Sequence, residues 1–206
     1  MTIQFRNAAK YYNDLKHQNN AWEFLQNAVD ADTLEEFGLL YRNEKRPNYL
    51  VELPTPGVEL IKEFEGCYLK AYCDPLSGAL PITIGWGSTR RLNGRPFYIG
   101  DTITQTEADE LLYKSLKIKY LPPLTKIPHW NEMNVNQQGA LLSFAYNLGA
   151  NFYGGSNFHT ISRVLRNKQW DKVPNTLYLY RNPGTRVEAG LARRRKAEGI
   201  LWKFDH

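Results

Sequence analysis

The sequence predicts an α+β fold: a mainly helical domain that carries a small antiparallel β-sheet near its start and is preceded by a small helical amino-terminal module. Three observations lead to this prediction. Apolar residues recur at helical spacing through most of the chain. Two short segments, residues 68–73 and 82–86, have the pattern of strands on either side of a turn-rich stretch. A group of prolines interrupts the helical pattern early in the chain.

The amino-terminal part is predicted to be a separate unit. Residues 1–45 show helical spacing and contain a capping box at Thr33–Glu36, which indicates a small helical module. Residues 46–56 contain three prolines, which a helix interior excludes, so we expect an extended linker there. The main domain is then expected over residues 57–206.

The main domain is predicted to begin with a helix and a sheet. A short helix is expected over residues 58–65, and Gly66 supplies its end. The two strands over residues 68–73 and 82–86 follow this helix. A third short strand is expected near Phe97–Ile99.

The rest of the main domain is predicted to be helical. Thr104–Glu107 is a capping box that opens one helix, and Asn136 is expected to cap another that ends at Gly149. A last helix is expected over residues 188–203, with one basic face. Its apolar residues are expected to face the core, and they are Leu191, Ala197, Ile200 and Leu201.

The composition is that of a folded globular protein. Of the 206 residues, 42% are hydrophobic and 23% charged, which is enough apolar material for a core and too much for a disordered chain. No run of about 18 or more apolar residues occurs, so we expect no membrane insertion. The amino terminus lacks the basic and then apolar layout of a secretory signal. We expect a monomer.

The charge distribution and the spacing of metal-binding residue types limit which partners and cofactors the sequence predicts. Residues 1–50 carry a net charge of −1 and residues 51–206 a net charge of +6, which favours polyanionic partners for the main domain. The dense basic cluster Arg193–Lys196 covers barely one helical turn, so a nucleic acid is not predicted as partner. The 2 cysteines and 4 histidines show no metal-ligand spacing, and no metal or other cofactor is predicted.

Glu65 and Asp74 are the candidate catalytic carboxylates. Glu65 is expected in the last turn of the first helix, where the negative end of the helix dipole and nearby apolar residues favour a protonated carboxyl. Asp74 is expected at a wetter turn, where free backbone N–H groups favour an ionised carboxylate. One neutral and one charged carboxyl group are the minimum that hydrolysis of a glycosidic bond requires.

The run Thr83-Ile84-Gly85-Trp86-Gly87 lies close behind this pair in the sequence. Thr83 offers a hydroxyl that can orient a water molecule. Glycines on a strand let a ligand or another chain approach the backbone, and Trp86 offers a flat apolar face. Each of these residues also has an ordinary structural interpretation, as a strand or core residue.

These residues resemble the catalytic stretch of the phage-type lysozymes, the endolysin or muramidase family of glycoside hydrolases with a T4-like lysozyme fold. The resemblance comprises Glu65, Asp74 nine positions later, and the run Thr83–Thr89. Two later stretches are similar to further motifs of that family. Phe144–Gly149 resembles its central helix, and Gly190–Glu198 resembles its carboxy-terminal helix.

The resemblance implies an enzyme that hydrolyses the β-1,4 bond between N-acetylmuramic acid and N-acetylglucosamine in bacterial peptidoglycan. Glu65 would protonate the leaving oxygen, while Asp74 and Thr83 would position or activate the attacking water. The lack of a signal fits an enzyme that stays in the host bacterial cytoplasm until its release and then acts on the cell wall. Two roles remain open for residues 1–45, namely wall binding and packing on the main domain.

Further site residues are expected around Glu65, Asp74 and Thr83. Arg194 and Arg195 are expected to support the site, since the resemblance suggests that an arginine of this helix pairs near the acid. Such a pair would favour the ionised form of Glu65 and oppose its role as acid. The expected substrate-binding residues are Tyr72, Gly85, Trp86 and Asn147.

Two departures from the family pattern and several alternatives stay open. The interval from Asp74 to Thr83 is longer than is usual in the family, and Ser88 occupies a position where histidine is common. Inverting chemistry would need carboxyl groups roughly 6.5–9.5 Å apart and retaining chemistry about 5–5.5 Å, and the sequence does not choose between them. Alternative functions are a chitin- or chitosan-hydrolysing enzyme of the same fold and a catalytically inactive wall-binding protein.

Overall fold

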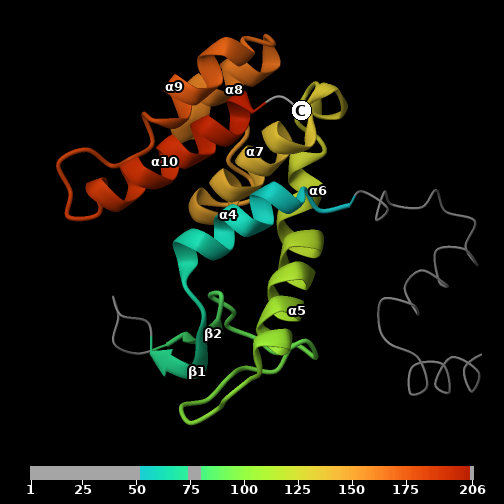
Figure 1. The fold of residues 1–206 in the computed structure, drawn as a ribbon, viewed down its shortest axis with the longest axis vertical. Coiled ribbons are helices and arrows are strands. Elements are labelled where there is room, and N and C mark those ends of the chain that lie inside the picture. Colours follow the sequence, from blue (N-terminus) through green and yellow to red (C-terminus); the bar gives the residue numbers. More distant parts are fainter. Residues whose placement is uncertain (1–51, 74–79, 205–206) are drawn as a thin grey trace, which may run out of the picture. The chain divides into compact units, whose positions relative to one another are not determined.

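The computed structural model describes residues 52–73 and 80–204 of the chain (Figure 1). The predicted amino-terminal module, most of the predicted linker and Asp74 lie outside these residues. From Glu52 onward the chain forms one compact unit. Helices make up most of this unit and a two-stranded antiparallel sheet accompanies them, which confirms the predicted α+β class.

Helix α4, Thr55–Glu65, opens the described part of the chain. Pro56 lies in its first turn, where the missing N–H has no intrahelical partner to lose, so the helix starts inside the last residues of the predicted linker. Gly66 ends the helix with φ of 68°, a backbone conformation that favours glycine. Val58 and Ile61 are fully buried on its inner face.

The sheet consists of strands β1, Tyr68–Cys73, and β2, Ile82–Gly85. Tyr72 pairs with Thr83 in its register. The third strand expected near Phe97–Ile99 does not form. Phe97 is buried against this sheet, but the N–H of Tyr98 donates to the carboxylate of Asp101 and the chain turns there instead of pairing.

A long helical segment follows, made of α5 (Gln105–Ser115), the π-helical turn η1 (Leu116–Tyr120) and α6 (Leu121–Leu124) (Figure 1). The predicted capping box at Thr104 is present and confirmed. The π-helical turn directly precedes Pro122 and Pro123. Neither proline has an N–H to donate, and both lie in the first turn of α6, where an N–H has no partner within that helix.

The remaining elements are packed helices. Three turns of 3-10 helix connect them: η2 (Trp130–Glu132), η3 (Ser156–Phe158) and η4 (Trp170–Lys172). The helices are α7 (Val135–Leu148), α8 (His159–Arg166), α9 (Val173–Leu177) and α10 (Glu188–Lys203). No helix within the described ranges is both long and apolar enough to cross a membrane.

The expected cap of α7 is wrong by two residues. Asn134 caps the helix, and its partner in the capping box is Gln137. Asn136 lies inside the first turn, where its buried side chain donates to the backbone carbonyl of Phe204.

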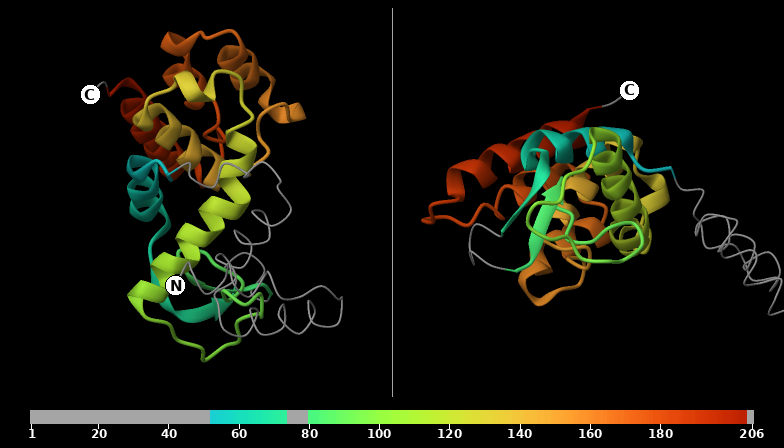
Figure 2. Two further views of the ribbon diagram at one scale, coloured as in Figure 1. Left: turned by 90° about the vertical axis from the view of Figure 1, so that its right-hand side faces the viewer. Right: turned by 90° about the horizontal axis from the view of Figure 1, so that it is seen from below.

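Helices α4, α7 and α10 pack against one another, and the views in Figure 2 show α4 and α10 along α7. Two glycines allow the closest approach. A Cβ atom on Gly57 would lie 2.4 Å from the carbonyl oxygen of Gly139, and one on Gly139 would lie 2.7 Å from the nitrogen of Gly57. The α4–α7 crossing therefore brings backbone against backbone and fixes where α4 ends relative to α7.

The inner face of α10 differs from the prediction. Ile200, expected to face the core, is 67% exposed. The residues that point inward are Arg194, Arg195, Glu198, Gly199 and Trp202. The helix therefore buries a charged cluster rather than an aliphatic stripe, and this cluster lies behind the carboxyl end of α4.

Candidate active site

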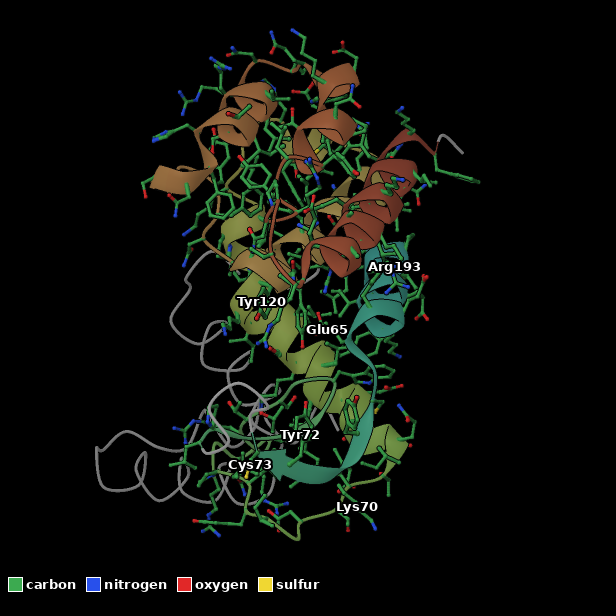
Figure 3. The ribbon with its side chains drawn as sticks, turned by 90° about the vertical axis from the view of Figure 1, so that its left-hand side faces the viewer. Glu65, Lys70, Tyr72, Cys73, Tyr120 and Arg193 are labelled. Atoms are coloured by element: carbon green, nitrogen blue, oxygen red, sulfur yellow. The ribbon has the colours of Figure 1, made fainter. Side chains whose placement is uncertain are left out.

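Glu65 is the last residue of α4, at the junction between the sheet and the packed helices. Figure 3 shows its side chain between the strand that carries Tyr72 and the helical body. The Nη1 group of Arg194, from α10, donates to Oε1 of Glu65 at 2.5 Å. The Glu65 side chain is 27% exposed whereas that of Arg194 is 5% exposed. The carboxyl group is thus reachable from solvent while its cationic partner is not.

Arg194 is fixed from several sides. Its Nη2 group donates to the backbone carbonyl of Ser143 at 3.2 Å, and its guanidinium carbon lies 5.7 Å from the centre of the Phe64 ring. Its Nε atom lies 3.4 Å from Oε1 of Glu198, one helical turn away. The guanidinium group therefore faces two carboxyl groups, one on each side.

Glu198 is completely buried. Its Oε1 atom accepts a hydrogen bond from the hydroxyl of Ser143 at 2.8 Å and lies 3.1 Å from Nη2 of Arg195. Its Oε2 atom has no hydrogen-bond partner. Burial raises the pKa of Glu198 to about 7, although Arg195 and Arg194 act to lower it.

Arg195 supports the helix packing rather than the reacting groups. It is completely buried, and its Nη2 group donates to the side-chain oxygen of Asn147 at 2.9 Å. Burial lowers the pKa of Arg195 to about 10. Asn147, expected to bind substrate, thus uses its side-chain oxygen for a contact between α7 and α10.

Thr83 and Gly85 lie on strand β2. The Thr83 hydroxyl donates a long, 3.4 Å hydrogen bond to the carbonyl of Pro81, and the residue pairs with Tyr72 across the sheet. Gly85 has φ of 62°, and a Cβ atom there would lie 3.2 Å from the Cβ of Ala108. Its packing against α5 accounts for the glycine without a ligand.

Trp86 is held by side chains from two helices. Its indole N–H donates to Oδ1 of Asp109 in α5 at 2.7 Å, and its backbone carbonyl accepts from the hydroxyl of Tyr146 in α7 at 2.7 Å. Lys62 of α4 donates to the other oxygen of Asp109 at 3.0 Å. The turn that follows β2 is therefore anchored to α4, α5 and α7.

The hydroxyl of Tyr146 lies among the groups of the site. Burial raises its pKa above the ordinary value, Glu65, Tyr120 and Tyr72 raise it further, and Arg194 opposes the rise. The Tyr146 and Tyr120 ring centres are 4.9 Å apart. The structure thus brings Tyr72 of the sheet, Glu65 of α4 and Arg194 of α10 around one hydroxyl group of α7.

Asp74, the second predicted carboxylate, lies outside the described residues. Within residues 52–73 and 80–204, no group of three or more His, Cys, Asp or Glu side chains is arranged to hold a metal ion. Of the predicted residues, the structure brings Glu65 and Arg194 into direct contact.

Sequence reasoning missed the residues that hold the others in place. Asp109 gave no signal, because its role depends on contacts with Trp86 and Lys62, which are distant in the sequence. Ser143 and Tyr146 lie on one face of α7, a helix recognised by its apolar residues and by the resemblance of Phe144–Gly149, and neither signal assigned a role to these two side chains. Glu198 is part of the stretch that resembles the family's carboxy-terminal helix, but no role was predicted for it, although it is four positions after Arg194 and therefore on the same helix face.

Comparisons with a family model and with known sequences point to the same family. A model of the phage lysozyme family matches residues 62–198. The endolysin of Salmonella phage P22 is 31% identical over 154 residues, which cover 74% of this chain and 99% of that protein. The endolysin of Lactococcus phage c2 is 37% identical over 142 residues, covering 69% of this chain and 56% of that longer protein.

Two solved structures with the same fold are similar to this chain over most of their own length. The crystal structure of a P22 lysozyme mutant has a TM-score of 0.58 and 28% identity, with 71% of this chain and 94% of that chain covered. The muramidase domain of SpmX from Asticaccaulis excentricus has a TM-score of 0.57 and 28% identity, with 75% and 99% covered.

Proposed function

Because the chain belongs to the phage lysozyme family of glycoside hydrolases, we propose that it is an endolysin that cleaves the β-1,4 bond between N-acetylmuramic acid and N-acetylglucosamine in bacterial peptidoglycan. The names of its relatives support this proposal. Those from Salmonella phage P22 and Lactococcus phage c2 are called endolysins, and one structural neighbour is called a muramidase domain. The net charge of +6 on residues 51–206 suits a polymer that carries carboxylates, and it argues against cationic chitosan.

Glu65 is the proposed general acid. This role is supported by one observation. The carboxyl group of Glu65 is partly exposed at the end of α4 and contacts the buried Arg194. As the proton moves to the leaving oxygen, negative charge develops on Glu65. Arg194 stabilises this charge, because its guanidinium group is already fixed at 2.5 Å and does not need to reorganise.

Asp74 and Thr83 are proposed to position or activate the attacking water. Thr83 is only partly buried, and its hydroxyl donates a long hydrogen bond to the carbonyl of Pro81, so its oxygen can still accept a hydrogen bond from a further partner. Strand β1, which ends at Cys73 directly before Asp74, begins three residues after Glu65. The short connection supports a role for both carboxyl groups in one site.

Tyr72 and Trp86 are proposed to contact the sugar chain, since both offer partly exposed aromatic surface on the sheet side of Glu65. Gly85 and Asn147 are better explained by packing, with Ala108 and Arg195 as their partners. Wall binding by residues 1–45 and retention in the host cytoplasm until release stay predictions.

The test is hydrolysis of purified peptidoglycan by the full chain and by Glu65→Gln. We expect turbidity to fall with release of reducing ends and no new free amines, and we expect Glu65→Gln to lose at least about a hundredfold in rate. Glu63→Gln is the matched control, because Glu63 is an exposed carboxylate in the same helix turn. Equal activity of Glu65→Gln and wild type would overturn the assignment, and release of amines would indicate an amidase or peptidase. Absence of both products with wall binding intact would favour an inactive wall-binding protein.

A further inference from the structure

The contact between Glu65 and Arg194 has two opposite effects on a general acid. It stabilises the carboxylate that remains after proton transfer, which favours the reaction. Before the reaction, however, the same positive charge favours loss of the proton that the acid must supply. The surroundings of Arg194 therefore decide how strongly it acts on Glu65.

Arg194 does not act on Glu65 alone. Its Nη1 group contacts Glu65, while its Nε atom lies 3.4 Å from Glu198 on the opposite side of the guanidinium. Ser143 joins the two residues, because its hydroxyl donates to Glu198 and its carbonyl accepts from Arg194. Arg194 and Glu198 are both buried, so solvent screens the interaction between their charges little.

We propose that Glu198 is a positioning residue that competes with Glu65 for Arg194 and thereby allows Glu65 to keep its proton to higher pH. This inference rests on the proposed role of Glu65 as the proton donor. When Glu198 is ionised, it attracts the guanidinium group and offsets its charge. When Glu198 is neutral, the whole charge of Arg194 acts on Glu65.

The polar and charged groups around Glu198 come from the helices that pack at this point. On α10 these are Arg194 and Arg195, at 3.4 and 3.1 Å from Oε1. Helix α4 contributes Glu65 through Arg194, and α7 contributes the hydroxyl of Ser143. Helix α9, which packs on α10 through Pro174 and Gly199, has no titratable side chain. Glu198 is therefore the one carboxyl group at the inner side of Arg194 among the described residues.

Glu198 ionises in the pH range in which the proposed acid has to keep its proton. Burial raises its pKa to about 7, so its charge appears at neutral and alkaline pH, where a general acid is in danger of losing its proton. Replacement of Glu198 by glutamine keeps the shape of the side chain but removes this charge at every pH. Arg194 then contacts Glu65 without a second carboxylate beside it.

The experiment compares the pH profiles of kcat/KM on peptidoglycan for the full-length wild type and Glu198→Gln. We expect the alkaline limb of the profile to move by about one pH unit toward lower pH, because one buried charge near the acid has been removed. At about one pH unit above the wild-type limb, the rate of the variant, as a fraction of its own maximum, should be roughly tenfold lower than that of wild type. A limb at the same pH in both proteins would overturn the proposal.

Two further variants separate charge from structure. Glu198→Asp restores the negative charge and should return the limb toward the wild-type position, even if the maximal rate is lower. Glu188→Gln removes a carboxylate from the same helix, but one that pairs with Arg181 away from the site, so it should leave the limb in place. A shift of equal size in Glu188→Gln would show a general charge effect and overturn the specific role.

A direct measurement distinguishes failure of this inference from failure of the proposed function. The carboxyl carbon of Glu65 can be titrated by carbon-13 NMR in wild type and in Glu198→Gln, without any substrate. If Glu65→Gln stays active, the proposed acid is wrong, yet a shifted titration of Glu65 would still support its coupling to Glu198. If Glu65→Gln is inactive and the titration does not move, the coupling alone is refuted.

Discussion

Asp109 connects three elements through one carboxylate, which accepts hydrogen bonds from Trp86, Lys62 and Gln105. Burial acts to raise the pKa of Asp109, but these three donors outweigh it, and the pKa lies below its ordinary value. The carboxylate is therefore ionised at neutral pH. Its contact with the indole N–H fixes the ring of Trp86 on the sheet side of the site.

Asp109→Ala is expected to destabilise the fold by about 1–2 kcal/mol, because the indole and ammonium groups lose their shared acceptor. It should also lower kcat/KM by about tenfold, since Trp86 is no longer fixed. Urea unfolding and peptidoglycan hydrolysis measure the two effects. Glu110→Ala, the adjacent exposed carboxylate, is the control, and equal losses in both variants would contradict the anchoring role.

At the scale of elements, the crossing of α4 and α7 places Glu65. Gly139→Ala introduces a methyl group 2.7 Å from the backbone nitrogen of Gly57, so the two helices must separate. We expect a loss of about 1–3 kcal/mol in the free energy of unfolding and reduced activity, because the end of α4 moves relative to Arg194. Thermal unfolding and rate measurements on the same samples test this.

The matched control for this variant is Gly190→Ala in α10. A Cβ atom on Gly190 meets no atom within 4 Å. Alanine also favours the helix over glycine, so stability should stay the same or rise by up to about 1 kcal/mol. If both substitutions had the same effect, helix propensity rather than the close approach would explain the loss.

The start or end of an element was predicted correctly where it depends on a few neighbouring residues. The capping box at Thr104 and the end of α4 at Gly66 are examples, since both depend on a few neighbouring residues. Asn136 was a wrong choice because two asparagines compete for the cap of α7, and a distant carbonyl satisfies the second one. The strand expected near Phe97 failed because Asp101 supplies a local alternative to pairing.

The inner face of α10 shows where hydropathy misleads. Apolar residues usually face the core, so Ile200 was expected inside. Burial of Arg194 and Arg195 becomes favourable only when Glu65, Ser143 and Glu198 surround them, and these partners come from three different helices. The candidate acid was predictable from the motif around it. The network behind it was not.

At the scale of the whole molecule, Glu198 adds a pH dependence to stability. Burial raises its pKa in the folded protein from 4.5 to about 7, so the folded protein holds a proton there that the unfolded chain releases. This contribution to stability is complete below pH 4.5 and is lost as the pH rises to about 7. Asp109 has the opposite sign, because its lowered pKa stabilises the fold above the ordinary value and this contribution is lost in acid.

Glu198→Gln isolates the first contribution. The difference in free energy of unfolding between wild type and variant should change by about 3 kcal/mol in favour of the variant as the pH rises from 4.5 to 7. Chemical unfolding at pH 4.5, 5.5, 6.5 and 7.5 gives this difference directly. A difference that stays constant over this range would mean that Glu198 does not change its charge there.

The acid and its arginine are 129 positions apart in the sequence. A ribosome that adds about 5–20 residues per second therefore exposes Glu65 several seconds before Arg194 exists. During that interval the nascent chain contains the proposed proton donor without its cation, and the catalytic arrangement cannot form from neighbouring residues alone. Synthesis of α10 is thus the step that completes the proposed site.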